Sequence, residues 1–133
     1  SRIHVINLED FSVSYIPIGS NPRAIVLSPD NSMMYVTMNL SGKVASWDLI
    51  NNKAGKSVKT GKAARSLAIS SDGTALFVVN FVSDTMSKVR TSDMKVLQNI
   101  KVCNEPIGIT YDSPTSRTWV ACYGGAIKIF DNK

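Results

Sequence analysis

The chain has 133 residues, of which 44% are hydrophobic and 19% are charged, with a formal net charge of +5. This balance is typical of a globular domain and excludes a predominantly disordered chain. The longest apolar runs are a handful of residues, far below the roughly 20 that a membrane-spanning helix needs. The first residues already have the pattern of a strand, so we expect no signal peptide at this end.

The excess of basic residues predicts an exposed sheet edge and not a nucleic-acid surface. Four lysines fall within residues 53–62, a stretch without aromatic residues, whereas single-stranded nucleic acid is bound by basic side chains interleaved with stacking aromatics. Lysine on an outer strand discourages aggregation between sheets. The two groups of basic residues are Lys53, Lys56, Lys59 and Lys62, and Lys88, Arg90, Lys95 and Lys101.

In chain order, the predicted elements are short strands separated by turn residues. The first strands are expected at residues 3–7, 23–27, 33–38, 43–49 and 53–60. The strand at 43–49 alternates, with Val44 and Ser46 on one face and Ala45 and Trp47 on the other, which is the two-residue period of a β-strand. No stretch has apolar residues at helical spacing over three turns. The chain is therefore expected to be all-β.

An internal repeat of 42 residues is the strongest signal. Four sets of positions keep this spacing through three units: Gly19, Gly61 and Cys103; Pro22, Ala64 and Pro106; Ile25, Leu67 and Ile109; and Tyr35, Phe77 and Trp119. Four short strands in 42 residues is the size of one β-propeller blade. An antiparallel sandwich is the alternative, but a sandwich requires no such period.

Several of these segments carry a recognisable motif. They are Gly19-Ser20-Asn21-Pro22, Ser28-Pro29-Asp30-Asn31, Tyr35-Val36-Thr37-Met38 and Val44-Ala45-Ser46-Trp47-Asp48 in the first unit, and Ser70-Ser71-Asp72-Gly73 and Phe77-Val78-Val79-Asn80 in the second. The units resemble the YVTN family of β-propeller repeats. The resemblance covers nearly the whole chain and implies a propeller fold; it says little about function.

The predicted fold class is a partial β-propeller of about three four-stranded antiparallel blades. We divide the chain into the end of a blade (1–15), two repeats (16–57 and 58–99) and an incomplete third (100–133). Propellers close with four to eight blades, so three blades leave apolar faces uncovered. We expect the chain to be a piece of a longer propeller. Association of two copies, or blades from a partner protein, are the alternatives.

Few residues suggest catalysis or metal binding. Cys103 and Cys122 do not have the spacing of a metal site; we expect two small buried side chains, with a disulfide as the alternative. His4, the single histidine, occupies a strand position equivalent to Ala45 and is expected to line a blade face or to point outward. We therefore predict no catalytic residue, no metal site and no cofactor.

The candidate ligand-binding residues lie where loops meet the strands. Arg23 and Arg65 share one repeat position at the start of an innermost strand, where two guanidinium groups suit a carboxylate or phosphate; pairing with a local carboxylate or carbonyl is the alternative. Glu105 is the best acidic candidate, in the loop before a first strand. Phe81 and Tyr123 are aromatic loop residues of the kind that anchors interfaces.

These observations favour a non-enzymatic binding or scaffold module that contacts a protein or glycan through its loops. The alternative is a segment of a propeller enzyme, lactonase-like or similar to a dehydrogenase heavy chain, with its catalytic residues mostly outside this segment. Nucleic acid is an unlikely partner because no basic patch carries aromatics. The family resemblance implies a location outside the cytoplasm, at the cell surface or in the periplasm. Asn39-Leu40-Ser41 is a glycosylation acceptor only in a eukaryotic secretory setting.

Overall fold

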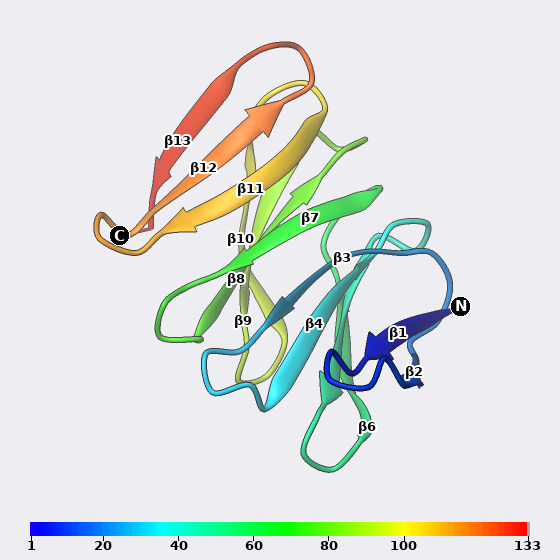
Figure 1. Cartoon of the computed structure of the whole chain (residues 1–133). Coiled ribbons are helices and arrows are strands. Elements are labelled where there is room, and N and C mark those ends of the chain that lie inside the picture. The colour runs from blue at the N-terminus through cyan, green and yellow to red at the C-terminus, as the bar shows by residue number, and fades with distance from the viewer. Residues whose placement is uncertain (133) are drawn as a thin grey trace.

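The structure, a computed structural model, describes residues 1–132 and contains only strands and turns in that range (Figure 1). The strands are β1 Arg2–Ile6, β2 Val13–Pro17, β3 Pro22–Leu27, β4 Met33–Met38, β5 Lys43–Asp48, β6 Lys53–Lys59, β7 Ala64–Ile69, β8 Ala75–Asn80, β9 Thr85–Arg90, β10 Lys95–Lys101, β11 Pro106–Asp112, β12 Arg117–Cys122 and β13 Ile127–Asp131. Residues 1–132 contain no helix of the length and hydropathy that crossing a membrane requires.

The strands form four antiparallel sheets, each of which is a propeller blade or part of one. We call them blade I (β1–β2), blade II (β3–β6), blade III (β7–β10) and blade IV (β11–β13). Within each sheet, consecutive strands pair with their sequence neighbours. This arrangement confirms the predicted fold class, an all-β partial propeller with a four-stranded unit.

The 42-residue repeat also appears in the backbone. Non-glycine residues with positive φ recur at equivalent turns, namely Asn21, Ala63 and Glu105 before each first strand, and Asn52 and Met94 before each fourth strand. Gly42 and Asp84 hold the same conformation in the turn between second and third strands. Left-handed backbone is easiest for glycine and tolerable for asparagine. The turn residues therefore set where each strand ends.

Adjacent blades pack face to face through apolar side chains. The innermost strands lie side by side, with β7 between β3 and β11 (Figure 1). Tyr35 of blade II and Leu76 of blade III belong to one buried cluster, and Phe77 of blade III and Val120 of blade IV belong to the next. A third cluster joins Ile16 of blade I to blade II. Each sheet is thus covered by its neighbour and not by a separate layer.

The outer strand of blade II is polar, as predicted. β6 is the edge strand of blade II, and six of its seven residues are exposed, including Lys53, Lys56 and Lys59. β10 is the corresponding edge of blade III. Lysine at these edges keeps the unpaired backbone groups solvated.

The expectation for the cysteines is wrong. Cys103 and Cys122 are not separate buried side chains but form a disulfide, with their Cα atoms 6.1 Å apart. The physical reason is that the connection from β10 to β11 passes the end of β12, which a separation of 19 residues in sequence does not reveal.

Candidate functional site

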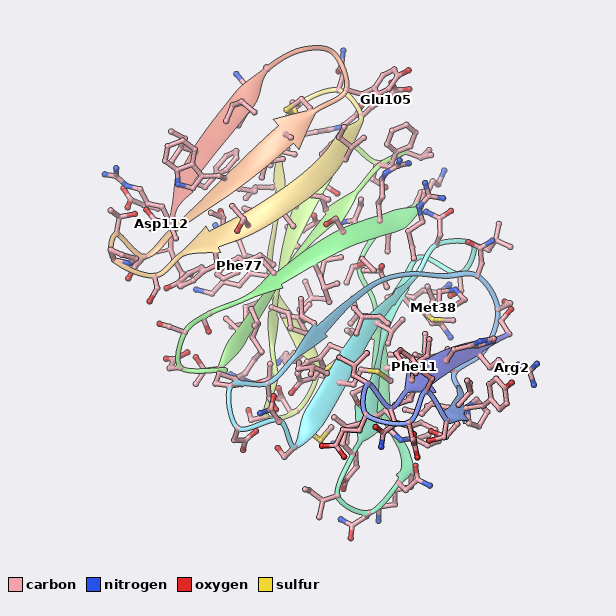
Figure 2. The ribbon with its side chains drawn as sticks, in the orientation of Figure 1. Arg2, Phe11, Met38, Phe77, Glu105 and Asp112 are labelled. Carbon is pink, nitrogen blue, oxygen red and sulfur yellow. A yellow bond between two sulfur atoms is a disulfide. The ribbon has the colours of Figure 1, made fainter. Side chains whose placement is uncertain are left out.

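A group of loop residues at one end of blades III and IV forms the candidate site. We call this group the loop rim and define it as Arg65, Phe81, Asp84, Glu105 and Tyr123. These residues come from the start of β7, the β8–β9 turn, the β10–β11 connection and the β12–β13 turn. Figure 2 shows Glu105 at the end of blade IV opposite Asp112, so the rim occupies one end only.

A cavity of about 540 Å³ lies within the loop rim. It is lined by Phe81, Val82, Asp84, Asn104, Glu105 and Gly124. Two of the residues predicted from the sequence, Phe81 and Glu105, therefore face the same space. The lining combines an aromatic ring with two carboxylates and an amide, which suits a polar partner that also has an apolar part.

The two predicted arginines are placed differently. The Arg65 guanidinium lies over the Phe81 ring, 4.9 Å from the ring centroid, in the geometry of a cation–π contact. Arg23 is exposed, and its guanidinium makes no hydrogen bond or ion pair with residues 1–132. Arg65 and Phe81 are thus brought together, while Arg23 stands on blade II.

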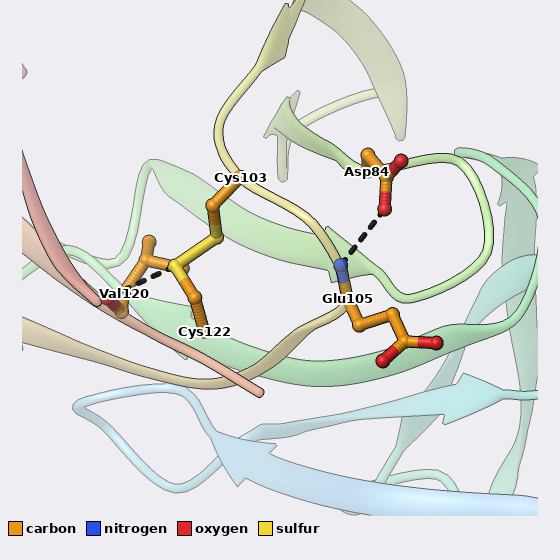
Figure 3. The surroundings of a disulfide bond; sticks show 5 residues. All are labelled: Asp84, Cys103, Glu105, Val120 and Cys122. Atoms are coloured by element: carbon orange, nitrogen blue, oxygen red, sulfur yellow. Dashed lines mark hydrogen bonds between the residues drawn. A yellow bond between two sulfur atoms is a disulfide. The ribbon is translucent and has the colours of Figure 1, made fainter. Parts of the chain in front are cut away.

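Glu105 and Tyr123 are held in place by backbone contacts. The Glu105 N–H donates to Asp84 Oδ1 at 2.8 Å (Figure 3), and the Tyr123 N–H donates to the Glu105 carbonyl at 2.9 Å. The disulfide joins Cys103, two residues before Glu105, to Cys122, one residue before Tyr123 (Figure 3). Both side chains remain free, since Tyr123 is 71% exposed and Glu105 is exposed.

The disulfide occupies a position that recurs in blades II, III and IV. The equivalent pairs, each 19 residues apart, are Gly19 and Met38, Gly61 and Asn80, and Cys103 and Cys122. A Cβ added at Gly61 would lie 2.7 Å from Asn80 Cγ, so this pair is in close contact. In these three blades the connection into the blade therefore approaches the end of the second strand at one point, and the chemistry there differs: a side chain close to glycine in blade II, hydrogen bonds in blade III and a covalent bond in blade IV.

In blade III, hydrogen bonds of the Asn80 side chain stand where blade IV has the disulfide. Its side chain is fully buried, and its Oδ1 accepts from Thr60 Oγ1 at 2.9 Å. Its Nδ2 donates to Ser87 Oγ at 3.0 Å and to Thr85 Oγ1 at 3.1 Å. A buried amide needs such partners because an unpaired polar group costs about 1–3 kcal/mol.

The single histidine and the aspartates of the repeated turns lie away from the loop rim. Among residues 1–132, no three His, Cys, Asp or Glu side chains lie close enough to hold a metal ion. His4 is exposed on blade I, edge-on to Tyr15 with ring centroids 4.7 Å apart. Asp30 and Asp72, at the opposite ends of the blades from the loop rim, accept hydrogen bonds from neighbouring turn residues.

Sequence reasoning missed Asp84 and Asn104. Asp84 has φ of 58° at the repeat position that Gly42 occupies, so the repeat alone suggested a turn residue and not a lining residue. The signal that could have identified Asp84 is its carboxylate, because the same repeat position in the preceding unit is a glycine. Asn104 lies in the connection between blades and has no marked counterpart in the other units.

No protein-family model matches the sequence, and no curated protein matches it significantly. Solved structures do match. Hydrazine synthase from Kuenenia stuttgartiensis is 29% identical over 84% of this chain and 33% of that chain, with a TM-score of 0.81. The RRP9 WD40 repeats are 14% identical over 87% and 37%, with a TM-score of 0.79. Dihydro-heme d1 dehydrogenase NirN, solved in complex with DHE, is 20% identical over 98% and 32%, with a TM-score of 0.72.

These likenesses support the β-propeller fold and include both WD40 repeat domains and propellers of enzymes. The chain spans about a third of the length of the structures it matches. The matched structures thus agree with a partial propeller.

Proposed function

We propose that this chain is a non-enzymatic binding module of a YVTN-type propeller and that its loop rim binds a protein or glycan partner. The observation that carries the proposal is the loop rim itself: Phe81 and Glu105 line one cavity, and Tyr123 stands exposed beside it. Exposed aromatics on a rigid backbone make good anchors because little side-chain freedom is lost on binding. The disulfide and the Asp84–Glu105 hydrogen bond supply that rigidity.

We further propose that the module works outside the cytoplasm, at the cell surface or in the periplasm. Disulfides persist in oxidising compartments and are rare in reducing ones. The Cys103–Cys122 bond supports this location. In a reducing compartment the bond would be lost, and it would no longer hold the loops that carry Glu105 and Tyr123.

Photo-crosslinking tests the proposed surface. A photoreactive amino acid is introduced at Tyr123 in the protein in its native cells, and crosslinked products are separated by mass. We expect a discrete product at Tyr123. Charge reversal at the rim by Glu105→Lys should reduce its yield at least fivefold, because a wrong charge at an interface costs on the order of 1 kcal/mol or more.

The matched control is Ile50, which is 74% exposed against 71% for Tyr123 but lies in the β5–β6 turn at the other end of the blades. The same photoreactive group at Ile50 should give no discrete product. Equal products at both positions, or a Tyr123 product that Glu105→Lys leaves unchanged, would contradict the proposal.

A propeller enzyme is the second candidate. It is favoured by the resemblance to the hydrazine synthase chain and to NirN, both named as enzymes. In that case the propeller's catalytic residues lie mostly outside these 133 residues. Metal content and lactone hydrolysis by the natural full-length product distinguish the two: clear turnover would favour the enzyme, whereas a discrete Tyr123 crosslink without turnover favours the binding module.

A further inference from the structure

Blades II and III distribute their charges unevenly between their two ends. Both blades are complete four-stranded sheets, so this distribution does not depend on the blades at the two ends of the chain. At the end away from the loop rim, acidic and basic side chains offset one another; they are Asp30, Asp48, Asp72 and Asp93, and Lys53, Arg90 and Lys95. At the loop-rim end, basic side chains dominate; they are Arg23, Lys43, Lys59, Lys62, Arg65 and Lys101, against Asp84.

Four lysines at the loop-rim end lie in a row with two exposed aliphatic side chains. Leu40 in the β4–β5 turn is 76% exposed, and Val82 in the β8–β9 turn is 59% exposed. We call this row the basic strip and define it as Leu40, Lys43, Lys59, Lys62, Val82 and Lys101. Apolar side chains that are exposed together with charged neighbours mark surfaces for interaction.

On blade II, strand pairing and one loop contact hold the residues of the basic strip together. Lys43 and Lys59 are directly opposite each other in the β5–β6 pair. The Thr60 N–H donates to the Gly42 carbonyl at 2.9 Å. This bond holds the β6–β7 connection against the turn that carries Leu40.

The basic strip continues from blade II to blade III through the same connection. The Val82 N–H donates to the Lys62 carbonyl at 3.2 Å, and the Lys62 N–H donates to Ser83 Oγ at 2.8 Å. On the other side of this turn, Lys101 Nζ donates to the Ser83 carbonyl at 3.2 Å. The lysines and the two aliphatic side chains therefore form one continuous surface.

The lysines of the basic strip are not neutralised by carboxylates of residues 1–132, since neither ion pair in that range includes one of them. Lys43 opposite Lys59 is a pair of like charges, which destabilises a sheet. A second like-charge pair, Lys95 opposite Arg90, lies at the other end of the blades, where Asp93 is 2.7 Å from Arg90. The positive charge of the strip is therefore available to an anionic partner.

The two aliphatic side chains distinguish between classes of anionic partner. A soluble polyanion would neutralise the lysines but leave Leu40 in water. Single-stranded nucleic acid stacks its bases on aromatic rings, which Leu40 and Val82 lack. A lipid bilayer offers both anionic headgroups and an apolar layer beneath them, and surfaces that combine basic with apolar side chains bind at this boundary.

We propose that the basic strip docks the propeller on the surface of a membrane that contains anionic phospholipids. The lysines contact the lipid phosphates, while Leu40 and Val82 enter the boundary between headgroups and acyl chains. Lysine suits this position because its aliphatic stem can lie on apolar surface while the ammonium group reaches the phosphates. The opposite turns, including the one that carries Ile50, then point away from the membrane.

This docking goes beyond the binding of a partner at the loop rim. Glu105 and Tyr123 lie outside the basic strip, on the side of blade IV. Asp84 accepts a hydrogen bond from the Glu105 N–H at 2.8 Å and so belongs to the rim. Binding to lipid vesicles therefore succeeds or fails independently of crosslinking at Tyr123.

Vesicle sedimentation tests the docking. The intact chain is mixed with vesicles of phosphatidylglycerol and phosphatidylcholine, or with vesicles of phosphatidylcholine alone, and the bound fraction is measured. We expect saturable binding to the anionic vesicles and binding at least tenfold weaker to the neutral ones. High salt should weaken the binding because it screens exposed charges.

Matched lysine variants test the role of charge. β6 and β10 each begin and end with lysine, and all four of these lysines are exposed. The double variant Lys59→Gln with Lys101→Gln should weaken binding to anionic vesicles at least tenfold, because each lysine near an anionic surface adds to the attraction. The control, Lys53→Gln with Lys95→Gln, changes the net charge equally at the opposite end of the same strands and should bind within about twofold of the wild type.

A second matched pair tests the insertion of an apolar side chain. Leu40 and Ile50 are 76% and 74% exposed, and both lie in turns of blade II but at opposite ends. Leu40→Ser should weaken binding at least threefold because it removes apolar area that the bilayer buries, whereas Ile50→Ser should bind like the wild type.

Three outcomes would overturn the proposal. They are absence of saturable binding to anionic vesicles or equal binding to neutral ones, equal losses in the two lysine double variants, and undiminished binding of Leu40→Ser. The last of these would indicate a surface that recognises charge alone, as in the binding of an acidic protein.

Discussion

One residue whose backbone is unfavourable for its side chain lies at the start of blade III. Ala63 has φ of 57°, a conformation that costs an L-residue with a Cβ about 1–2 kcal/mol. Its counterpart in blade II is Asn21, for which the left-handed region is easier. The loop that leads into β7 therefore carries more backbone strain at Ala63 than the loop that leads into β3 carries at Asn21.

Replacing Ala63 by glycine should stabilise the protein. Relief of the left-handed strain outweighs the greater freedom of glycine in the unfolded chain, so we expect a gain of about 0.5–1 kcal/mol in the free energy of unfolding. Chemical denaturation measures it. Ala68→Gly, in the middle of strand β7, is the control and should have the opposite sign. A loss of stability in Ala63→Gly would contradict this account.

Asp30 and Asp72 make the stability of the turns depend on pH. The Ser28 hydroxyl donates a hydrogen bond to Asp30, and the Ser70 hydroxyl donates one to Asp72. The residue two positions after each aspartate donates as well, and together these bonds lower the pKa of each carboxyl to about 2. A folded-state pKa below the unfolded value of about 3.9 contributes stability above that value. The contribution is present above about pH 4 and is lost as the pH falls toward 2.

The double variant Asp30→Asn with Asp72→Asn should flatten this acid dependence. Denaturation midpoints of the wild type should fall between about pH 4 and pH 2 more steeply than those of the variant, because asparagine does not titrate there. Glu9→Gln, which removes an exposed carboxylate outside the repeated turns, is the control and should retain the wild-type slope. Parallel slopes for wild type and double variant would refute the assignment.

At the scale of elements, blades III and IV are each joined to the segment that leads into them at the same repeat position. Blade IV uses the disulfide where blade III uses the buried Asn80. A covalent joint constrains the unfolded chain as well, and for a loop of this length it is worth about 3 kcal/mol in the chain-entropy description.

Removing the disulfide with Cys103→Ala and Cys122→Ala should lower the free energy of unfolding by about 2–4 kcal/mol. A reducing agent should lower the stability of the wild type by a similar amount and leave the double variant unchanged. Hydrogen exchange should increase first in the β10–β11 connection, which the bond holds against β12. A wild type whose stability does not respond to reduction would contradict the proposed joint.

At the scale of the whole molecule, the faces of the end blades decide how the chain behaves in solution. Trp119 of blade IV is equivalent to Tyr35 and Phe77, which are 4% and 3% exposed because the next blade covers them. Trp119 itself is 40% exposed, and Ile127 and Ile129 lie on the same face. Apolar faces of this kind drive association.

We expect the chain to self-associate with rising concentration, and Trp119→Lys to suppress this association. Light scattering over a concentration series measures the mass directly. Val82→Lys, which changes a 59% exposed apolar residue in a turn, is the control and should associate like the wild type. A wild type that remains monomeric at high concentration, or a Trp119→Lys variant that associates equally, would contradict this expectation.

Local periodicity was sufficient to predict the blades. The alternation around Val44, the turn residues near Asp30 and the spacing from Tyr35 to Phe77 to Trp119 all act over a few residues or at a fixed repeat, so the sequence displays them directly. The same spacing placed Arg65 near the start of β7 and Glu105 just before β11, as the structure finds.

The contacts between loops of different elements depended on the tertiary structure. The sequence determined that the chain is all-β, that its unit has four strands and that the outer strand of blade II is polar, because these properties follow from side chains close along the chain. Only the folded structure joined Cys103 to Cys122, placed Arg65 over Phe81 and gave Asp84 a role in holding Glu105. These contacts depend on the direction in which each turn leaves its blade, and that direction is fixed by the packing of one blade on the next.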